Sequence, residues 1–193
     1  MAPSPSTEPT LDDADCRTLL DVARSAIGHA LIGGKAMRVD PANFSEALRA
    51  SRAVFVTLTI EGQLRGCIGS LEPVHTLVED VARHAVSAAM RDPRFPPLTT
   101  DELQRIGLHI SVLSPPEPID FTDERDLIEK IRPGVDGLIL EGEGYRGTFL
   151  PSVWDMTRDA ARFLDQLKLK AGLKPGPLPA DARILRYTAQ YIE

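Results

Sequence analysis

A pair of extended runs joined by a two-residue turn constrains the fold more than any other feature of the sequence. Val54–Ile60 is rich in β-branched and aromatic residues, Glu61-Gly62 follows, and Leu64–Gly69 continues in an extended pattern. A turn this short joins antiparallel neighbours, because parallel strands need a long crossover connection. The sequence therefore predicts a β-hairpin over residues 54–69.

Helical and extended patterns follow the hairpin in mixed order. Thr76-x-x-Glu79 has capping-box spacing, and the apolar stripe after it ends near Arg91, before Pro93. Strict alternation over Ile106–Val112 predicts a strand buried on one face. Similar patterns predict helices over about 11–33, 127–131 and 157–171, strands flanking 141–147, and a strand over 182–192. This order predicts an α+β fold, with a largely antiparallel sheet packed with helices.

Composition narrows the class of protein. The chain has 193 residues, of which 42% are hydrophobic and 26% charged, enough for a sizeable core, while residues 1–10 are expected to form a disordered tail. No apolar run is long enough to span a membrane, and the N-terminus lacks a leader pattern, so a cytoplasmic protein is expected. The net charge of −6 disfavours nucleic acid and anionic membranes as partners, although a local basic cleft of Arg65, Arg91 and Arg94 stays open.

Neither the glycine-rich string nor the histidines indicate a ligand site once their sequence context is considered. Gly142–Gly147 matches G-x-G-x-x-G, but Thr148–Pro151 follows where a dinucleotide site needs a helix, so a hairpin turn is predicted. The histidines have no H-E-x-x-H or C-x-x-C partners, and no metal site is predicted. His109, opposite the apolar positions of its strand, is expected to face solvent.

Cys67 is the strongest candidate for chemistry. Arg65 and Cys67 share one face of an extended segment, and a neighbouring guanidinium favours the thiolate. Gly66 and Gly69 lack a Cβ, which lets a ligand or another backbone approach closely. The alternative is a small buried hydrophobe, which is a common role for a free cysteine.

Glu72, Asp92 and Arg94 form a second group, in loops stiffened by prolines. They are candidates for ligand binding, while Asp92 and Arg94 could equally tie down a helix end through a salt bridge. We expect Glu72, Asp92 and Arg94 to line one concave surface together with Arg65 and Cys67.

The string Leu64-Arg65-Gly66-Cys67-Ile68-Gly69-Ser70-Leu71-Glu72-Pro73, with Asp92–Phe95 and Ser111–Ser114, resembles the AMMECR family, which includes protein A of the AmmeMemoRadiSam system. The resemblance extends from about Leu19 to Tyr191. It implies one AMMECR-type domain over residues 11–193, with a larger subdomain from both chain ends, a smaller inserted α/β subdomain, and the motif near the cleft between them. It also implies Memo-type and radical-SAM proteins as partners, but no settled activity.

Two functions follow as hypotheses. The first is an enzyme or enzyme partner that acts on a small molecule or macromolecule, with Cys67 as nucleophile or redox thiol and Arg65 favouring its thiolate. Substrate binding would fall to a set of neighbours, Gly66, Gly69, Glu72, Asp92 and Arg94. The alternative is a non-catalytic binding module for a nucleotide, RNA or a partner protein. The sequence identifies neither a cofactor nor a general base.

Overall fold

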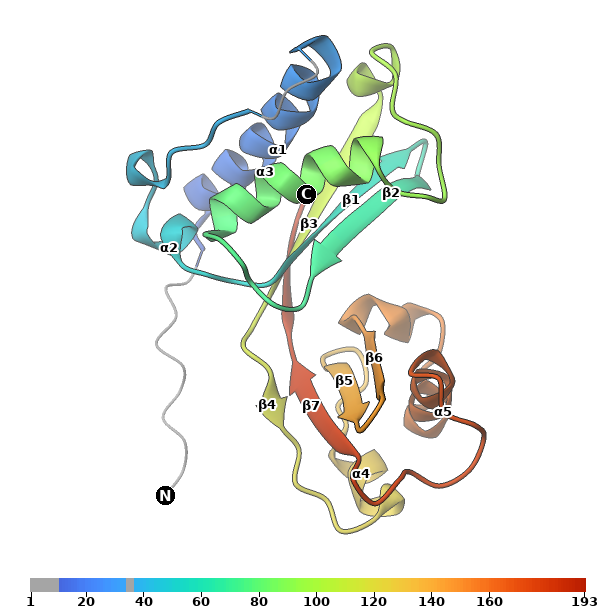
Figure 1. Ribbon diagram of the computed structural model, residues 1–193. Helices are drawn as coiled ribbons and strands as arrows, with labels where there is room; N and C mark the ends of the chain where they lie inside the picture. Colours follow the sequence, from blue (N-terminus) through green and yellow to red (C-terminus); the bar gives the residue numbers. More distant parts are fainter. Residues whose placement is uncertain (1–10, 34–36) are drawn as a thin grey trace. The chain divides into compact units, whose positions relative to one another are not determined.

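The computed structural model describes residues 11–33 and 37–193, and it divides the chain into two compact units (Figure 1). Unit 1 consists of Met1–Val112 with Gln190–Glu193, and unit 2 of Leu113–Ala189. The predicted tail of residues 1–10 lies outside the described residues. No helix within the described ranges is long and apolar enough to cross a membrane.

Unit 1 is a four-stranded sheet with two long helices on one face (Figure 1). The strand order is β2-β1-β3-β8, so β2 is an edge strand. The elements are α1 (Asp13–Gly33), η1 (Pro41–Asn43), α2 (Glu46–Arg49), β1 (Val54–Ile60), β2 (Gln63–Ser70), α3 (Leu77–Met90), η2 (Glu102–Gln104), β3 (Ile106–Leu113) and β8 (Ala189–Ile192). Burial alternates along β1, which places every second side chain in the core against the helices.

The predicted hairpin is confirmed, with one irregularity. β1 and β2 pair antiparallel around Glu61 and Gly62, whose φ angles of 52° and 76° suit a tight hairpin turn. The register shifts between Leu58 and Thr59, whose partners are Gly66 and Leu64, so Arg65 is the extra residue of a β-bulge. The bulge re-aims the Arg65 side chain, and the simple two-residue alternation from Arg65 to Cys67 does not hold there.

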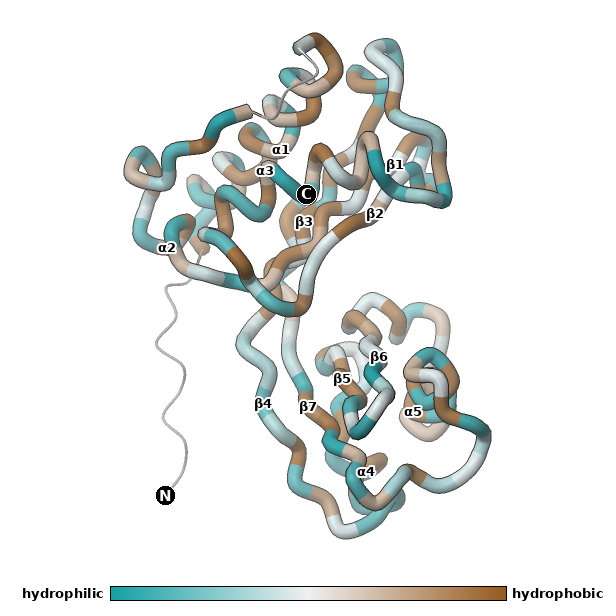
Figure 2. Tube along the Cα trace, in the orientation of Figure 1, coloured by the Kyte–Doolittle hydropathy of each residue, from teal (hydrophilic) through white to brown (hydrophobic). Residues whose placement is uncertain are grey.

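The helices follow the sequence signals closely. The capping box of Thr76 and Glu79 begins α3, which ends at Met90 shortly before Pro93, as predicted. Hydrophobic and hydrophilic residues alternate along α1, which matches one buried and one exposed stripe (Figure 2). Two short elements, η1 and α2, have only three and four residues and therefore carry no periodicity that could predict them.

Unit 2 is a second four-stranded sheet, of order β4-β7-β5-β6, packed with helices. Its described strand pairs are antiparallel, which confirms the α+β fold class. Gly144, with φ 81°, lies in the turn between two of these strands, so the G-x-G-x-x-G string is a hairpin turn as predicted. The elements are β4 (Glu117–Pro118), α4 (Glu124–Lys130), β5 (Gly137–Gly142), β6 (Tyr145–Phe149), η3 (Pro151–Asp155), α5 (Ala160–Lys170) and β7 (Arg183–Tyr187).

The structure differs from the prediction of one strand over residues 182–192. This segment forms two strands, β7 and β8, which belong to different sheets. They separate at Thr188, whose N–H donates to the Ser114 hydroxyl and whose carbonyl accepts from the Ser114 N–H, both at 3.0 Å. An apolar pattern does not encode which sheet each half joins, because that depends on distant partners.

Candidate functional site

Gly66 sets the direction of the Cys67 side chain. A Cβ at Gly66 would collide with the backbone carbonyl of Ala88, because α3 packs directly on β2 at this point. Neighbouring residues of a strand point to opposite faces, so the Cys67 side chain points away from α3. A Cβ at Gly69 would collide with Phe55 of the paired strand. The close approach that these glycines permit is therefore made by the chain itself.

Asp92 and Arg94 bind the backbone of Cys67 on the open side of the edge strand, an arrangement we call the edge clasp. The N–H of Cys67 donates to Asp92 Oδ2 at 2.9 Å, and Arg94 Nη2 donates to the Cys67 carbonyl at 3.2 Å. Arg94 also donates to Asp92 through Nε at 2.9 Å and Nη2 at 2.6 Å. The clasp thus fixes both polar backbone groups of Cys67 that face away from β1.

The edge clasp is an ion pair with one buried and one exposed member. Asp92 is 3% exposed, whereas the Arg94 side chain is 53% exposed. The hydrogen bonds from Arg94, and then that from the Cys67 N–H, outweigh burial and hold the pKa of Asp92 well below its usual range. The same contacts with Asp92 raise the pKa of Arg94. Both groups are therefore charged at neutral pH, and the exposed part of Arg94 is available to an anion.

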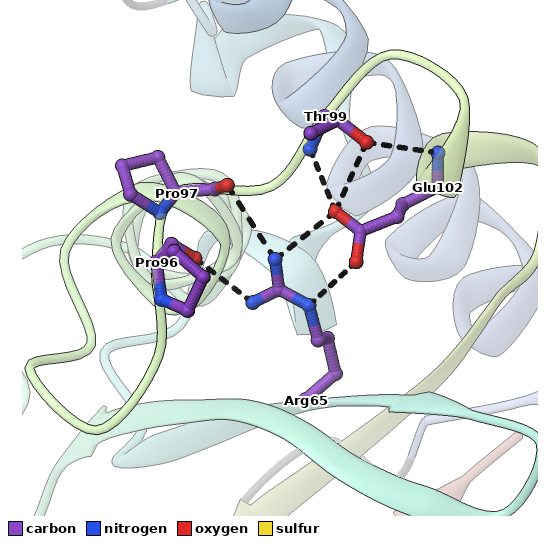
Figure 3. Close-up of polar contacts among 5 residues, drawn as sticks. All are labelled: Arg65, Pro96, Pro97, Thr99 and Glu102. Atoms are coloured by element: carbon purple, nitrogen blue, oxygen red, sulfur yellow. Dashed lines mark hydrogen bonds and ion pairs between the residues drawn. The ribbon is translucent and has the colours of Figure 1, made fainter.

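Arg65 is directed at Glu102, across the loop that follows α3 (Figure 3). Its Nε and Nη2 donate to the two carboxylate oxygens of Glu102 at 2.8 and 3.0 Å, and it also donates to the carbonyls of Pro96 and Pro97. Arg65, followed by Thr99, lowers the pKa of Glu102 to about 2. The charge of Arg65 is thus matched by Glu102, and its main contacts tie the loop to β2.

Phe95 links Arg65 to the edge clasp. The guanidinium carbons of Arg65 and Arg94 lie 5.9 and 5.6 Å from the centre of its ring, within cation–π range. The structure therefore brings four predicted site residues together: Arg65, Cys67, Asp92 and Arg94. Glu72 is exposed, and its backbone exchanges hydrogen bonds with the Ser70 hydroxyl, so these bonds do not join it to the others.

The sulfur of Cys67 lies in a row of polar side chains that crosses three strands. Thr57 is the cross-strand partner of Cys67, and its hydroxyl donates to Cys67 Sγ at 3.2 Å. His109 is the partner of Thr57 on the other side. Adjacent strands are about 4.8 Å apart, so Cys67 and His109 flank Thr57 across a span of about 10 Å. Thr57, Cys67 and His109 form what we call the polar row.

His109 is held by contacts at both ring nitrogens. Nδ1 lies 3.2 Å from a carboxylate oxygen of Glu193, and Nε2 lies 3.3 Å from the hydroxyl of Thr59. Its side chain is 39% exposed. His109 was not among the site residues predicted from the sequence; the available signal was its place opposite the apolar positions of its strand. Within residues 11–33 and 37–193, no group of three or more His, Cys, Asp or Glu residues could hold a metal ion.

Comparisons with known proteins cover nearly the whole chain. The AMMECR1 family model matches residues 20–192. A protein of Methanothermobacter thermautotrophicus is 44% identical over 178 residues, which are 90% of this chain and 91% of the relative. Protein MJ0810 of Methanocaldococcus jannaschii is 40% identical over 179 residues, 89% of this chain and 86% of the relative. The crystal structure of the uncharacterized protein PH0010 from Pyrococcus horikoshii superposes with a TM-score of 0.85 at 36% identity, covering 94% of this chain and 92% of that chain.

Proposed function

The chain belongs to the AMMECR1 family, and from that premise we propose that Cys67 is the reactive thiol of an enzyme or of an enzyme's partner protein. One observation carries the proposal: the backbone of Cys67 is bound on its outer side by the edge clasp, while its sulfur receives a hydrogen bond from Thr57 on the face away from α3. A hydrogen bond donated to sulfur favours its charged, nucleophilic form. A rigid backbone fixes where that sulfur points.

The neighbours of Cys67 take distinct roles in this proposal. Arg94 binds an anionic part of the substrate through its exposed side, and Asp92 is a positioning residue that holds Arg94 and the Cys67 N–H. Arg65 positions the loop through Glu102. Gly66 and Gly69 support the site by letting Ala88 and Phe55 pack closely against β2, and Glu72, which follows β2, is the remaining residue of the predicted binding set.

We assign the role of base to His109, which the sequence analysis left open. With Nδ1–H donating to Glu193, Nε2 carries the lone pair that accepts from Thr59 and can accept a proton. In the step we propose, the Cys67 thiol gives its proton to this nitrogen through bridging water, because Thr57 lies between the two residues. The sulfur lone pair then adds to a carbonyl carbon of the substrate, the π electrons of the C=O bond move onto its oxygen, and protonated His109 returns the proton to that oxygen.

Memo-type and radical-SAM proteins are the partners we propose, and the family resemblance of the Leu64–Pro73 string supports them. The test is co-purification of the full chain with a Memo-type and a radical-SAM protein. Retention of either protein supports the partnership, and loss of both at low salt contradicts it.

The thiol proposal is tested by alkylation with iodoacetamide between about pH 6 and pH 9. The chain contains two cysteines, so Cys16→Ser isolates Cys67 and Cys67→Ser isolates Cys16 as a matched control. Burial, followed by three neighbouring aspartates, raises the pKa of Cys16, which makes it a slow control thiol. We expect Cys67 to react about tenfold faster than Cys16 at neutral pH, and His109→Gln and Thr57→Val to slow its alkylation. A Cys67 that reacts no faster than Cys16 contradicts the thiol chemistry and leaves a non-catalytic binding module.

A further inference from the structure

A second candidate site lies in unit 1, in a cavity of about 360 Å³ along one side of α3, which we call the α3 trough. Its apolar floor is formed by Ala26 of α1, Met37, and Ala82 and Val86 of α3, and two arginines of the α3 side, Arg83 and Arg91, line it as well. This volume falls within the usual range for small-molecule sites. The trough shares no lining residue with the edge clasp or the polar row.

The two arginines of the trough have no partner within the chain as described. Over residues 11–33 and 37–193, neither the Arg83 nor the Arg91 guanidinium donates a hydrogen bond or joins an ion pair. They occur in a chain in which Asp and Glu outnumber Lys and Arg by 28 to 22, so acidic partners are not scarce. Two exposed guanidiniums left unpaired beside an apolar floor are complementary to an anion.

The acidic and titratable groups of the trough are already engaged. Glu79 accepts from the backbone N–H and the hydroxyl of Thr76 at 3.1 and 2.7 Å, so its carboxylate serves the start of α3. His75 Nδ1 lies 2.9 Å from the buried carboxylate of Asp80. These contacts leave Arg83 and Arg91 as the charged side chains of the trough that are free to bind a ligand.

The spacing on α3 adds a hydroxyl between the two arginines. Arg83, Ser87 and Arg91 follow one another at intervals of four residues, so they lie on one side of the helix, with about 12 Å between the first and the last Cα. These three hydrogen-bond donors follow one side of α3, and the apolar side chains of Ala82 and Val86 lie next to them in the sequence. A ligand that satisfies both parts has an anionic head and an apolar body.

We propose that the α3 trough binds a small molecule with an aliphatic chain and an anionic head, either phosphate or carboxylate. Arg83, Ser87 and Arg91 bind the head, and Ala82 and Val86 contact the chain. Among the described residues that line the trough there is no Phe, Tyr or Trp, and the one aromatic ring, that of His75, is bound to Asp80, which disfavours a stacked nucleobase as the ligand. The proposal is independent of the chemistry assigned to Cys67.

The test is isothermal titration calorimetry of the full chain with octyl phosphate, octanoate and octyltrimethylammonium, each below its micellar concentration. We expect one molecule of octyl phosphate or octanoate to bind, and the tighter of the two identifies the head group. Arg83→Ala with Arg91→Ala is expected to weaken binding at least tenfold. The charge-matched control, Arg17→Ala with Arg158→Ala, changes two exposed arginines elsewhere and should alter affinity less than twofold.

Three results would overturn the proposal: unchanged affinity in the Arg83/Arg91 double variant, equally tight binding of octyltrimethylammonium, or equally tight binding of inorganic phosphate alone. Val86→Asp provides a second variant at a partly buried position of the floor, and it should abolish binding of both anions. The alkylation rate of Cys67 should be the same in all trough variants, which separates a failure of this site from a failure of the thiol chemistry.

Discussion

The edge clasp and the α3 trough use the same residue type in opposite ways. Arg94 and Arg65 each bind a carboxylate of the chain, Asp92 and Glu102 respectively, and both also donate to backbone carbonyls. The trough arginines lack such acceptors among the described residues. Arg91 and Arg94 are only three residues apart, yet Arg94 binds Asp92 within the chain and Arg91 lines the trough. The guanidiniums of Arg65 and Arg94 are held in place by acceptors of the chain, and only the exposed side of Arg94 stays available, whereas those of the trough leave all their donors to a ligand.

Among the variants that compare the clasp region with the trough, Gly66→Ala on β2 should have the largest effect on stability. The added Cβ would collide with the Ala88 carbonyl of α3, so either the helix or β2 must move. We expect a loss of about 3 kcal/mol in the free energy of unfolding, measured with urea. Gly28→Ala is the matched control, because its Cβ would lie 3.5 Å from Leu103 in ordinary contact and α1 gains helix propensity. Equal stability of the two variants would show that close packing of α3 on β2 is not required.

Asp92→Asn should have the next largest effect. The variant keeps the shape of the side chain but removes the charge that binds Arg94 and accepts from the Cys67 N–H. We expect the free energy of unfolding to fall by about 2 kcal/mol, because hydrogen bonds to a charged group are lost at a buried position. Arg83→Ala, in the trough, should change it by less than about 0.5 kcal/mol. The contrast between the two regions fails if both variants are equally destabilised.

Acid should weaken the clasp region and spare the trough. The pKa values of Asp92 and Glu102 are both lowered from ordinary values of 3.8 and 4.5, that of Glu102 to about 2. Groups with lowered pKa values stabilise the fold fully above their unfolded values and lose that contribution as the pH falls. We expect the free energy of unfolding to fall by at least about 2 kcal/mol between pH 5 and pH 3, with a shallower slope in Glu102→Gln. An unchanged slope in that variant would contradict the assigned role of Glu102.

Local patterns were sufficient to predict the hairpin, the start of α3 and the turn at Gly144. Each depends on residues within a few positions of one another, and their conformational preferences act locally. The proximity of Cys67, Asp92 and Arg94 could also be predicted, because a stiff proline-containing loop follows α3. The pairing of Arg65 with Glu102 could not, since 37 residues separate them and no periodicity relates them.

The remaining features depend on tertiary structure. The bulge at Arg65 changes the direction of one side chain, and the pattern of apolar and polar residues in β2 does not predict it. The division of the last extended segment into β7 and β8 is decided by which strands lie beside each half. The α3 trough combines one helix face with Ala26 and Met37 from other segments, and this cavity emerges only when they pack.

The edge clasp also affects how copies of this chain behave toward one another. The outer edge of β2 would otherwise present the N–H and carbonyl of Cys67 to any extended segment that approached. Asp92 and Arg94 occupy both groups and add charge at that point, so a neighbouring molecule cannot continue the sheet there without displacing them. The same two side chains that fix the Cys67 backbone therefore also guard the protein against self-association through its sheet edge.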